Sequence, residues 1–544
     1  MAGQPIYILG EGNQRTRGRD AQSNNIMAGK AVANAVRTTL GPKGMDKMLV
    51  DSMGDVVITN DGATILKEMD IEHPAAKMIV EVAKSQDDQV GDGTTTAAIL
   101  AGELLAKAEE LIAKGVHPTL IATGYREAAK KSSEILDTIT IAISPDDTVG
   151  LKKIASTAIS GKGAESYKDI LSDLAVDAVR SVVEETDSGL VADIDDIKIE
   201  KQAGASISNS QLVDGLVIDK FRSHPNMPEK IEGAKILVLS VPLEFRKTDM
   251  DAEIKITSPD QMQMFLDQEE KMIKAISDKV IDSGANVVFC QKGIDDIAQY
   301  YLEKAGVYAT RRVKKSDLKR LCRATGATNI QDIDEITADD LGEAALVEEK
   351  DIKGVKMTYV IGCKNPKTTT VILHGGTQHV VDALQRAFND ALRVVGVAIE
   401  DEKIVVGGGS PEIELSLRLS EYASTLTGRE QLAVSKFSEA LEIIPETLAE
   451  NSGLDSIDKL VELRSQHEDG NKNAGLDVYT GKVVDMWECG IVEPLRIKTQ
   501  AINAATETTV MILRIDDVVA SAKGAGGGPA PDMSGMEMDM DMGV

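Results

Sequence analysis

The sequence predicts a multidomain protein of mixed α+β and α/β type, with mainly helical parts near both ends and an α/β domain between them. At 544 residues the chain exceeds the length at which one hydrophobic core keeps growing, and 42% of its residues are hydrophobic. Apolar residues recur at helical spacing in the first 140 positions and again after about position 410. Strand-like runs alternate with helical runs between about positions 214 and 373, which is typical of an α/β domain.

The first helix is expected from Asp20 to Leu40, where Gly41-Pro42 ends it because proline lacks a backbone N–H. This turn also exposes backbone that a ligand can reach. Two short strands follow, at Lys47 to Asp51 and Val56 to Thr59, and the turn between them predicts a hairpin. Three more helices are then expected, with first residues at Ala63, Pro74 and Pro118.

Residues 91–96 read Gly-Asp-Gly-Thr-Thr-Thr and lead directly into a segment with helical periodicity. A helix N-terminus favours anions, because it carries unpaired N–H groups and the positive end of the helix dipole. Gly93 permits a close approach of phosphate, and Asp92 is the kind of hard oxygen ligand that Mg²⁺ accepts. Hydroxyl donors to phosphate oxygens are available on Thr94, Thr95 and Thr96. The stretch matches neither a Walker A loop nor GxGxxG, and an ordinary capped turn before a buried helix explains it equally well.

Two further polar residues have both a chemical and a structural interpretation. Asp61 lies at a strand-to-helix corner, where an aspartate either caps the helix or takes part in chemistry. Lys162 lies between two glycines, so its side chain either reaches a phosphate or is solvated in a loop. Gly408 and Gly409 belong to a Gly-Gly-Gly-Ser-Pro stretch at 407–411 that precedes a helix and lets the backbone approach a ligand.

In the α/β region, strands are expected at Ala234 to Val241 and Ala285 to Cys290. Helices are expected at Ile294 to Lys304 and Lys315 to Ala324. Within it, a long charged segment from Glu244 to Ser277 carries Met250, Met262, Met264 and Met272. Methionine adapts to many shapes, so a protruding segment of this kind can contact varied partners, although core packing also explains each methionine.

The last third of the chain is again mainly helical. A helix from Gln378 to Val395 carries Asp390. A second helix, from Arg429 to Glu450, contains Pro445 and should be kinked there. Residues 492–498 are expected to be extended.

The composition argues against several classes of protein. Acidic residues outnumber basic ones by 88 to 60, and the net charge of −28 argues against nucleic acid as a partner because phosphate binding needs a basic surface. The four cysteines are far apart, which suits reduced thiols better than disulfides or zinc. No run of 18 apolar residues and no signal-peptide pattern occurs, so we expect a cytoplasmic protein without a membrane span.

Several motifs in fixed order resemble those of group II chaperonins, and the archaeal thermosome subunits are the most similar type. The motifs are Leu40-Gly41-Pro42-Lys43-Gly44-Met45-Asp46-Lys47-Met48, Asn60-Asp61-Gly62-Ala63-Thr64-Ile65-Leu66, Gly91-Asp92-Gly93-Thr94-Thr95-Thr96, Gly407-Gly408-Gly409 and the helix that contains Pro445. The resemblance extends over residues 15 to 522 and therefore over almost the whole chain.

The resemblance implies three domains, built by a chain that goes out and returns. These are a mainly helical equatorial ATPase domain at 1–146 and 403–523, a small intermediate hinge domain at 147–215 and 368–402, and an α/β apical domain at 216–367. The apical domain would carry a helical protrusion, or lid, at about 244–277. Residues 524–544 are expected to be a disordered tail, which departs from the Gly-Gly-Met repeats common in the family by being richer in Asp and Met.

The resemblance also implies an ATP site with Mg²⁺. Asp92 would ligate the metal, while Gly93, Thr94, Thr95 and Thr96 would hold the phosphates and Lys162 would reach toward the γ-phosphate. The nucleotide's other side would contact Leu40, Gly41 and Pro42, its nucleoside would lie against Gly408 and Gly409, and its ribose would be held by Glu493. Asp61 and Asp390 would orient the attacking water.

The implied function is that of an ATP-dependent chaperone that binds non-native polypeptides and encloses them in the cavity of a double ring. Each ring would contain eight or nine subunits, identical or mixed, with the built-in lid in place of a separate co-chaperonin. A small-molecule kinase would need an acceptor pocket with its own base, for which the sequence offers no spare residues. An inactive binding scaffold is disfavoured by the joint presence of Asp61, Asp92 and Asp390.

Overall fold

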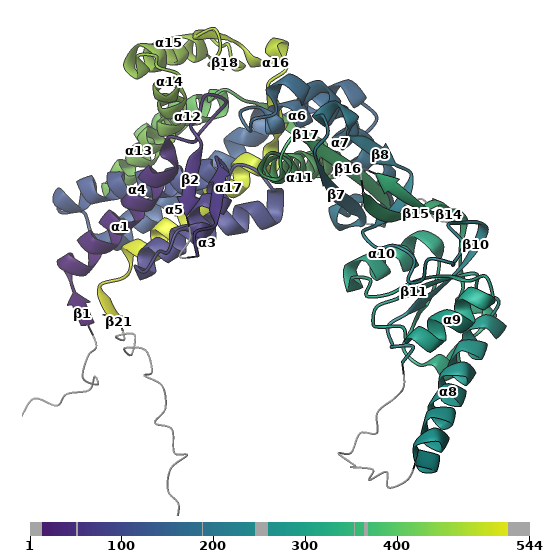
Figure 1. The fold of residues 1–544 in the computed structure, drawn as a ribbon. Helices are drawn as coiled ribbons and strands as arrows, with labels where there is room; N and C mark the ends of the chain where they lie inside the picture. The colour runs from purple at the N-terminus through teal and green to yellow at the C-terminus, as the bar shows by residue number, and fades with distance from the viewer. Residues whose placement is uncertain are drawn as a thin grey trace, which may run out of the picture.

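The computed structural model describes residues 14–50, 53–187, 189–244, 259–352, 354–363 and 368–520. The chain forms an arch, with a helical body at one end, an α/β part at the other and a smaller middle part between them (Figure 1). The tail predicted at 524–544, Met250 and the first half of the predicted protruding segment lie outside the described residues. Within the described ranges, no helix combines the length and the apolar character that a membrane crossing requires.

The helical body takes its core from both ends of the chain. Its helices are α1 (Arg19–Arg37), α2 (Gly62–Glu68), α3 (Pro74–Val90), α4 (Thr94–Ala113), α5 (Pro118–Thr138), α12 (Ser410–Thr425), α13 (Arg429–Leu441), α14 (Ile443–Asn451), α15 (Ser456–Glu468), α16 (Met486–Cys489) and α17 (Leu495–Leu513). In the core, Tyr125 packs edge-to-face against Phe437 with ring centroids 5.5 Å apart, and its hydroxyl donates to Leu104 O. Because apolar burial is the main stabilising term in folding, neither end of the chain can complete this core alone.

Short strand pairs connect segments of the helical body. β1 (Gln14–Arg17) pairs antiparallel with β21 (Asp517–Ala520), so the two described ends of the chain lie side by side (Figure 1). β2 (Lys47–Val50) and β3 (Val56–Thr59) form the predicted hairpin. Two further pairings bring segments toward the site, in a sheet of β20 (Val492–Pro494), β17 (Lys403–Val406) and β4 (Ile141–Ala142) and a hairpin of β18 (Ala474–Asp477) and β19 (Lys482–Asp485).

Two predicted elements near the C-terminus differ from the structure. The helix expected from Arg429 to Glu450 is two helices, α13 and α14, which meet at Glu442 rather than kinking at Pro445. Proline clashes with the carbonyl four residues earlier, and that residue is Leu441, the last residue of α13. The extended segment expected at 492–498 is only three residues long, because α17 already starts at Leu495.

The middle part contains α6 (Thr148–Ile159), α7 (Lys168–Val182), α11 (Gln378–Asp401) and a small sheet with the order β7 (Ile197–Ala203), β16 (Thr369–Gly375) and β8 (Gln211–Val213). A smaller hairpin of β5 (Val183–Thr186) and β6 (Gly189–Ala192) lies beside it. Leu151, Val176 and Leu392 belong to one buried cluster, so the two passes of the chain through this part share a core. The predicted helix at Gln378 to Val395 continues to Asp401.

The described residues of the α/β part form a seven-stranded sheet. Its strands are β9 (Gly215–Ile218), β10 (Lys230–Leu239), β11 (Val287–Cys290), β12 (Tyr308–Thr310), β13 (Asn329–Ile330), β14 (Gly342–Ile352) and β15 (Val355–Cys363). β10, β11 and β12 are parallel, whereas β14 and β15 form an antiparallel hairpin. The accompanying helices are α8 (Pro259–Asp282), α9 (Asp296–Lys304) and α10 (Lys315–Thr325).

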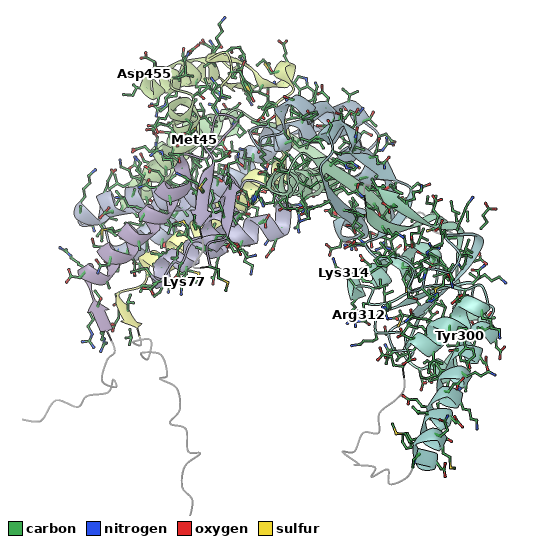
Figure 2. The ribbon with its side chains drawn as sticks, viewed as in Figure 1. Met45, Lys77, Tyr300, Arg312, Lys314 and Asp455 are labelled. Carbon is green, nitrogen blue, oxygen red and sulfur yellow. The ribbon has the colours of Figure 1, made fainter. Side chains whose placement is uncertain are left out.

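Helix α8 extends beyond the sheet at the far end of the arch (Figure 1). Met262, Met264 and Met272 on this helix are exposed, which is inconsistent with the alternative that they pack in a core. Figure 2 shows Arg312 and Lys314 on the side of the α/β part that faces the helical body, and both side chains are exposed.

Candidate nucleotide-binding site

A cavity of about 450 Å³ lies where the helical body meets the middle part. Segments from several distant regions of the chain line it, and the lining includes Leu40, Gly41, Pro42, Asp61, Asp92, Gly93, Thr94, Thr95, Thr96, Lys162, Gly408, Gly409 and Glu493. These are all of the predicted site residues except Asp390, which lies behind the lining and contacts it through Lys162. A volume of this size is within the range of small-molecule sites.

The start of α4 borders this cavity without a side-chain cap. Gly93 is the N-cap residue, with φ 78° in the left-handed region, and no side chain accepts a hydrogen bond at this position. The first N–H groups of a helix have no partners within the helix, so an anion in the cavity can accept them. Residues 91–96 thus cap the end of α3 through Gly91 and leave the start of α4 without a side-chain cap.

The glycines of this loop are required by close packing. A Cβ atom on Gly93 would lie 2.8 Å from Ile497 Cγ2 and 3.1 Å from Gln86 Nε2. The fully buried Gln86 donates from Nε2 to Asp92 O at 2.9 Å and to Ile497 O at 3.2 Å. The loop is thus held in place by α3 and α17 before any ligand binds.

The start of α12 borders the same cavity but offers fewer free N–H groups than α4, because Pro411 has none and Ser410 N already donates to Gly407 O at 3.3 Å. Gly409 is its N-cap residue with φ 78°, and again no side chain caps the helix. A Cβ atom on Gly408 would lie 2.7 Å from the sulfur of Met486, and one on Gly409 would lie 2.7 Å from Pro445 Cβ. Two uncapped helix N-termini therefore border one cavity, which favours a ligand with negative charge.

Asp61 caps α2, as one of the two interpretations expected. Its carboxylate accepts hydrogen bonds from Thr64 N at 2.8 Å, Thr64 Oγ1 at 2.7 Å and Ala63 N at 3.3 Å. It also accepts from Thr94 Oγ1 at 3.2 Å, so the cap of α2 contacts the first residue of α4. The capping interpretation is confirmed. Asp61 also lies in the cavity wall, and its part in orienting the attacking water stays a prediction.

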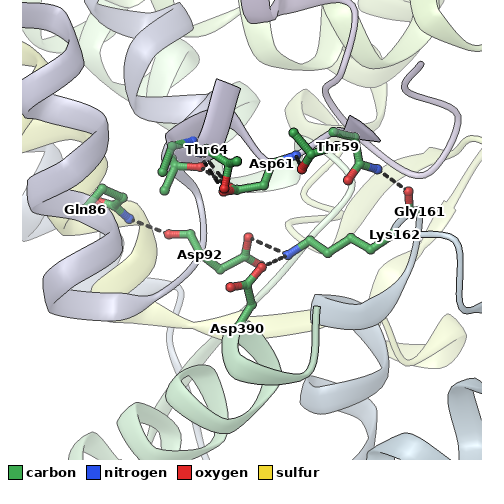
Figure 3. A network of polar contacts seen from close by, with 11 residues as sticks. Thr59, Asp61, Thr64, Gln86, Asp92, Gly161, Lys162 and Asp390 are labelled. Atoms are coloured by element: carbon green, nitrogen blue, oxygen red, sulfur yellow. Dashed lines mark hydrogen bonds and ion pairs between the residues drawn. The ribbon is translucent and has the colours of Figure 1, made fainter. Parts of the chain in front are cut away.

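Lys162 joins three carboxylate-bearing segments (Figure 3). Its Nζ lies 2.5 Å from Asp390 Oδ2 and 3.3 Å from Asp92 Oδ1. The preceding carbonyl, Gly161 O, accepts from Asn60 Nδ2 in the segment that carries Asp61. The alternative of a solvated loop lysine is wrong, since the ammonium is bound to carboxylates and its side chain is 18% exposed.

The charges at this site do not balance among the side chains. Burial alone would lower the pKa of Lys162, but the carboxylates of Asp390 and Asp92 outweigh it and raise that pKa, so the ammonium stays charged. Burial raises the pKa of Asp390 to about 7, and the nearby charges of Asp92 and Asp61 act in the same direction against the opposing effect of Lys162. Lys162 thus contacts the carboxylates of Asp390 and Asp92, the nearby charge of Asp61 also raises its pKa, and a further cation would be stabilised beside these groups.

The donor set fits Mg²⁺ bound together with phosphate, although it does not form a complete protein cage. In the described part of the chain, no group of three His, Cys, Asp or Glu side chains has a geometry that could hold a metal ion. Mg²⁺ at nucleotide sites is typically held by one or two carboxylates, with phosphate oxygens and water as the other ligands. Asp92, in the cavity wall, can supply such a carboxylate.

Lys498 is a cavity residue that the sequence patterns did not reveal. It lies on α17 with its Nζ 2.8 Å from Glu412 Oε1 and 2.9 Å from Glu493 Oε1. Burial raises the pKa of Glu493, while Lys498 lowers it and Glu412 raises it. A lysine on the buried side of a helix, next to Ile497 and Ala501, was the signal that could have identified it.

Comparisons with known proteins identify the family of the chain. The model of the TCP-1/cpn60 chaperonin family matches residues 32–523. The chain is 60% identical to thermosome subunit beta of Archaeoglobus fulgidus over 539 residues, which cover 98% of this chain and 99% of the relative. It is 56% identical to a thermosome subunit of Pyrococcus horikoshii over 547 residues, covering 99% of this chain and 100% of the relative.

A solved structure gives the same result. The open-state monomer of a group II chaperonin from Methanococcoides burtonii is 69% identical and matches with a TM-score of 0.62, covering 78% of this chain and 100% of that one. The predicted resemblance is therefore confirmed. This chain belongs to the TCP-1/cpn60 chaperonin family.

Proposed function

We propose that this chain is one subunit of an ATP-driven chaperone that encloses non-native polypeptides in the cavity of a double ring. The observation that carries the proposal is the cavity bordered by two helix N-termini without side-chain caps, with Asp61 and Asp92 in its wall and Lys162 joining Asp92 to Asp390. Membership of the chaperonin family supports chaperone activity, and the cytoplasm is the expected setting. The proposal goes beyond family membership in four features, which are the bound nucleotide, the metal ion, the ring and the lid.

Different residues of the cavity would contact different parts of the nucleotide. The first turn of α4 and the hydroxyls of Thr94, Thr95 and Thr96 would bind the phosphates. Gly408 and Gly409 would lie against the nucleoside, Glu493 would accept hydrogen bonds from the ribose, and Leu40, Gly41 and Pro42 would cover the opposite side. Asp92 would hold Mg²⁺, which when bound neutralises charge on the phosphate oxygens.

Hydrolysis would depend on positioning rather than on a covalent intermediate. Asp61 and Asp390 would orient a water molecule by accepting its hydrogen bonds. Lys162 now contacts both Asp92 and Asp390. When a phosphate binds beside Asp92, the ammonium would leave these carboxylates and contact a phosphate oxygen instead. This exchange would free Asp390 to act on water.

The location of these residues suggests how hydrolysis is coupled to movement. Asp92 belongs to the helical body, whereas Lys162 and Asp390 belong to the middle part. We assign the helical body as the equatorial domain, the middle part as the intermediate hinge and the α/β part as the apical domain, with the predicted boundaries. The hinge would complete the site only when it closes, and α8 with its exposed methionines would form part of the lid.

The test replaces Asp390 and Asp61 with asparagine. Asparagine keeps the size of both side chains, and at position 61 it keeps the ability to cap α2, while it removes the charge. We expect ATP turnover to fall by roughly 10²-fold or more in each variant, as for the loss of other preorganised electrostatic groups. A change within about threefold of the native rate would refute the assigned roles.

The chain offers a matched control for Asp61. Asp455 caps α15 by accepting from Ile457 N at 3.0 Å and Asp458 N at 3.1 Å, and Figure 2 shows it on the outer side of the arch. Asp455→Asn should leave turnover unchanged. Electron micrographs with and without Mg-ATP would then test assembly and lid closure together, since a particle without rings would contradict the chaperone proposal.

A further inference from the structure

Three charged residues of α11 lie on one face of the helix. Arg386, Asp390 and Arg393 are spaced at i, i+4 and i+7, which places them in one stripe. Asp390 contacts Lys162, and each arginine contacts the backbone of the helical body. This stripe, which we call the α11 face, is therefore a place where the middle part touches the helical body.

Arg386 binds the segment that carries Asp61. Its Nη2 donates to Ile58 O at 3.0 Å, and Ile58 lies in β3 three residues before Asp61. Neither Arg386 nor Ile58 lines the cavity. The contact therefore fixes the distance between α11 and this segment without occupying the space for a ligand.

Arg393 binds the segment that carries Asp92. Its Nη1 donates to Asp87 O and Asp88 O, each at 3.2 Å, in the last turn of α3. The last carbonyls of a helix lack partners within the helix, so a guanidinium there is stabilising. The bond lies only a few residues before Asp92.

The aliphatic stem of Arg393 also packs against the same segment. A Cβ atom on Gly91 would lie 2.4 Å from Arg393 Cδ and 2.5 Å from Arg393 Cβ. Gly91 is the C-cap of α3 and has φ 79°, so both the backbone and the space require glycine. The side chain of Arg393 therefore lies across the residue that directly precedes Asp92.

The geometry points to Arg386 and Arg393 as a pair of positioning residues that hold α11 at two points and thereby set where Asp390 lies relative to Asp61 and Asp92. The inference rests on the proposed hydrolysis of ATP, and it goes beyond that proposal by assigning two residues outside the cavity. Loss of one contact would let α11 tilt, and small displacements of a group that orients the reacting atoms are costly to turnover.

The experiment compares Arg386→Met, Arg393→Met and the double variant with the native chain. We expect kcat for Mg-ATP hydrolysis to fall by about 10-fold or more in the double variant, while KM for ATP changes by less than about twofold. Arg393→Lys should recover part of the rate, because lysine keeps the charge but offers a single ammonium in place of the planar guanidinium. An unchanged kcat in the double variant would overturn the inference.

Arg429→Met is the matched control. Arg429 Nη1 donates to Gly115 O at 3.2 Å, which is the same kind of bond between guanidinium and carbonyl, within the helical body and away from the cavity. Its replacement should leave kcat unchanged. An equal loss of kcat in this variant would show a general loss of stability and would refute a positioning role.

Hydrogen exchange of the protein without nucleotide gives a second readout. In the double variant, amides at 384–396 of α11 and 84–90 of α3 should exchange faster, with no change in the distant helices. Faster exchange with unchanged kcat would show that the arginines stabilise the contact of α11 with the helical body without positioning Asp390, which would refute the inference. Unchanged exchange in the double variant would also overturn it. A native protein without ATP turnover would refute the proposed function, and the exchange data would still decide whether the arginines hold α11.

Discussion

Lys162 Nζ lies 2.5 Å from Asp390 Oδ2, although the two residues are 228 positions apart in the chain. The same ammonium lies 3.3 Å from Asp92 Oδ1, so it connects the middle part with the helical body. A cation that already has two carboxylate partners can exchange them for a phosphate without moving far. One side chain of the cavity wall therefore contacts both α11 and the loop before α4.

We expect Lys162→Met to reduce ATP turnover by about 10²-fold, because it removes the cation that would stabilise charge on the phosphates. The fold should tolerate the change, since the pKa of Asp390 is about 7 and its carboxyl can take up a proton when the ammonium is lost. Steady-state ATPase assays and thermal unfolding measure the two effects. Lys152→Met is the control, because Lys152 forms a pair with Asp173 at 2.7 Å in which both side chains are well exposed. Native-like turnover in Lys162→Met would contradict the assignment.

We expect Gly409→Ala to raise KM for ATP by about 10-fold or more, because a Cβ atom there would meet Pro445 and displace the start of α12 from the cavity. Gly453→Ala separates this effect from backbone strain. Gly453 has φ 74°, close to the 78° of Gly409, but a Cβ atom on it would meet nothing within 4 Å. Gly453→Ala should lose about 1–2 kcal/mol of stability from its positive φ alone, and Gly409→Ala should lose more because of the clash with Pro445. Only Gly409→Ala should lose affinity for ATP, as measured by titration calorimetry. Equal KM values in the two variants would argue against a nucleotide at this helix end.

We expect alkylation of Cys489 at pH 8 to be slowed by Mg-ATP, because this exposed thiol lines the cavity. The other three thiols should react far more slowly. Burial raises the pKa of Cys290, Cys322 and Cys363 to about 11, so only about 0.1% of each is thiolate at pH 8, and this fraction grows about tenfold for each pH unit up to that pKa. Mass spectrometry of iodoacetamide adducts measures both effects, with Cys489→Ser as the control. Labelling of Cys489 that ATP leaves unchanged would place the nucleotide elsewhere.

We expect the β2–β3 hairpin to be covered by a neighbouring subunit in the ring. Met48 is 66% exposed, Val50 61% and Met53 89%, and an apolar surface of this kind marks a contact with another protein. Met48→Glu combined with Val50→Glu should therefore lower the assembled mass, measured by light scattering after size-exclusion chromatography. Val149→Glu, at a residue 65% exposed on α6, should leave the mass unchanged. A native mass in the double hairpin variant would show that the hairpin is not a subunit contact.

The parts of the site that lie in short glycine-rich loops could be predicted from the sequence. Gly91 to Thr96 and Gly407 to Gly409 combine glycine with a following helix, and both features can be read from adjacent residues. The family resemblance assigned roles to Lys162, which its flanking glycines had already marked, and to Asp390, and the side chains of these two residues come together only in the fold. No local pattern could have paired them, because their contact depends on how α6 and α11 pack.

The parts of the site that escaped prediction are charged residues within helices, outside the glycine-rich loops. Arg393 on α11 looks like an ordinary exposed position in the sequence, and Lys498 was missed although it lies on the apolar side of α17, yet the two bind the end of α3 and Glu493. The break between α13 and α14 was also missed, because proline marks where a helix is disturbed but not which residue absorbs the change. These features are decided by tertiary contacts rather than by local propensity.

The shared core of the helical body has a consequence for how the chain is made. Roughly 290 residues separate the end of α5 at Thr138 from the start of α13 at Arg429, and the two helices bury Tyr125 and Phe437 against each other. At about 5–20 residues per second, a ribosome needs about 15–60 s to bridge that interval. During this time the apolar faces of the first helices stay uncovered, so a newly synthesised subunit is itself a candidate client for a chaperone.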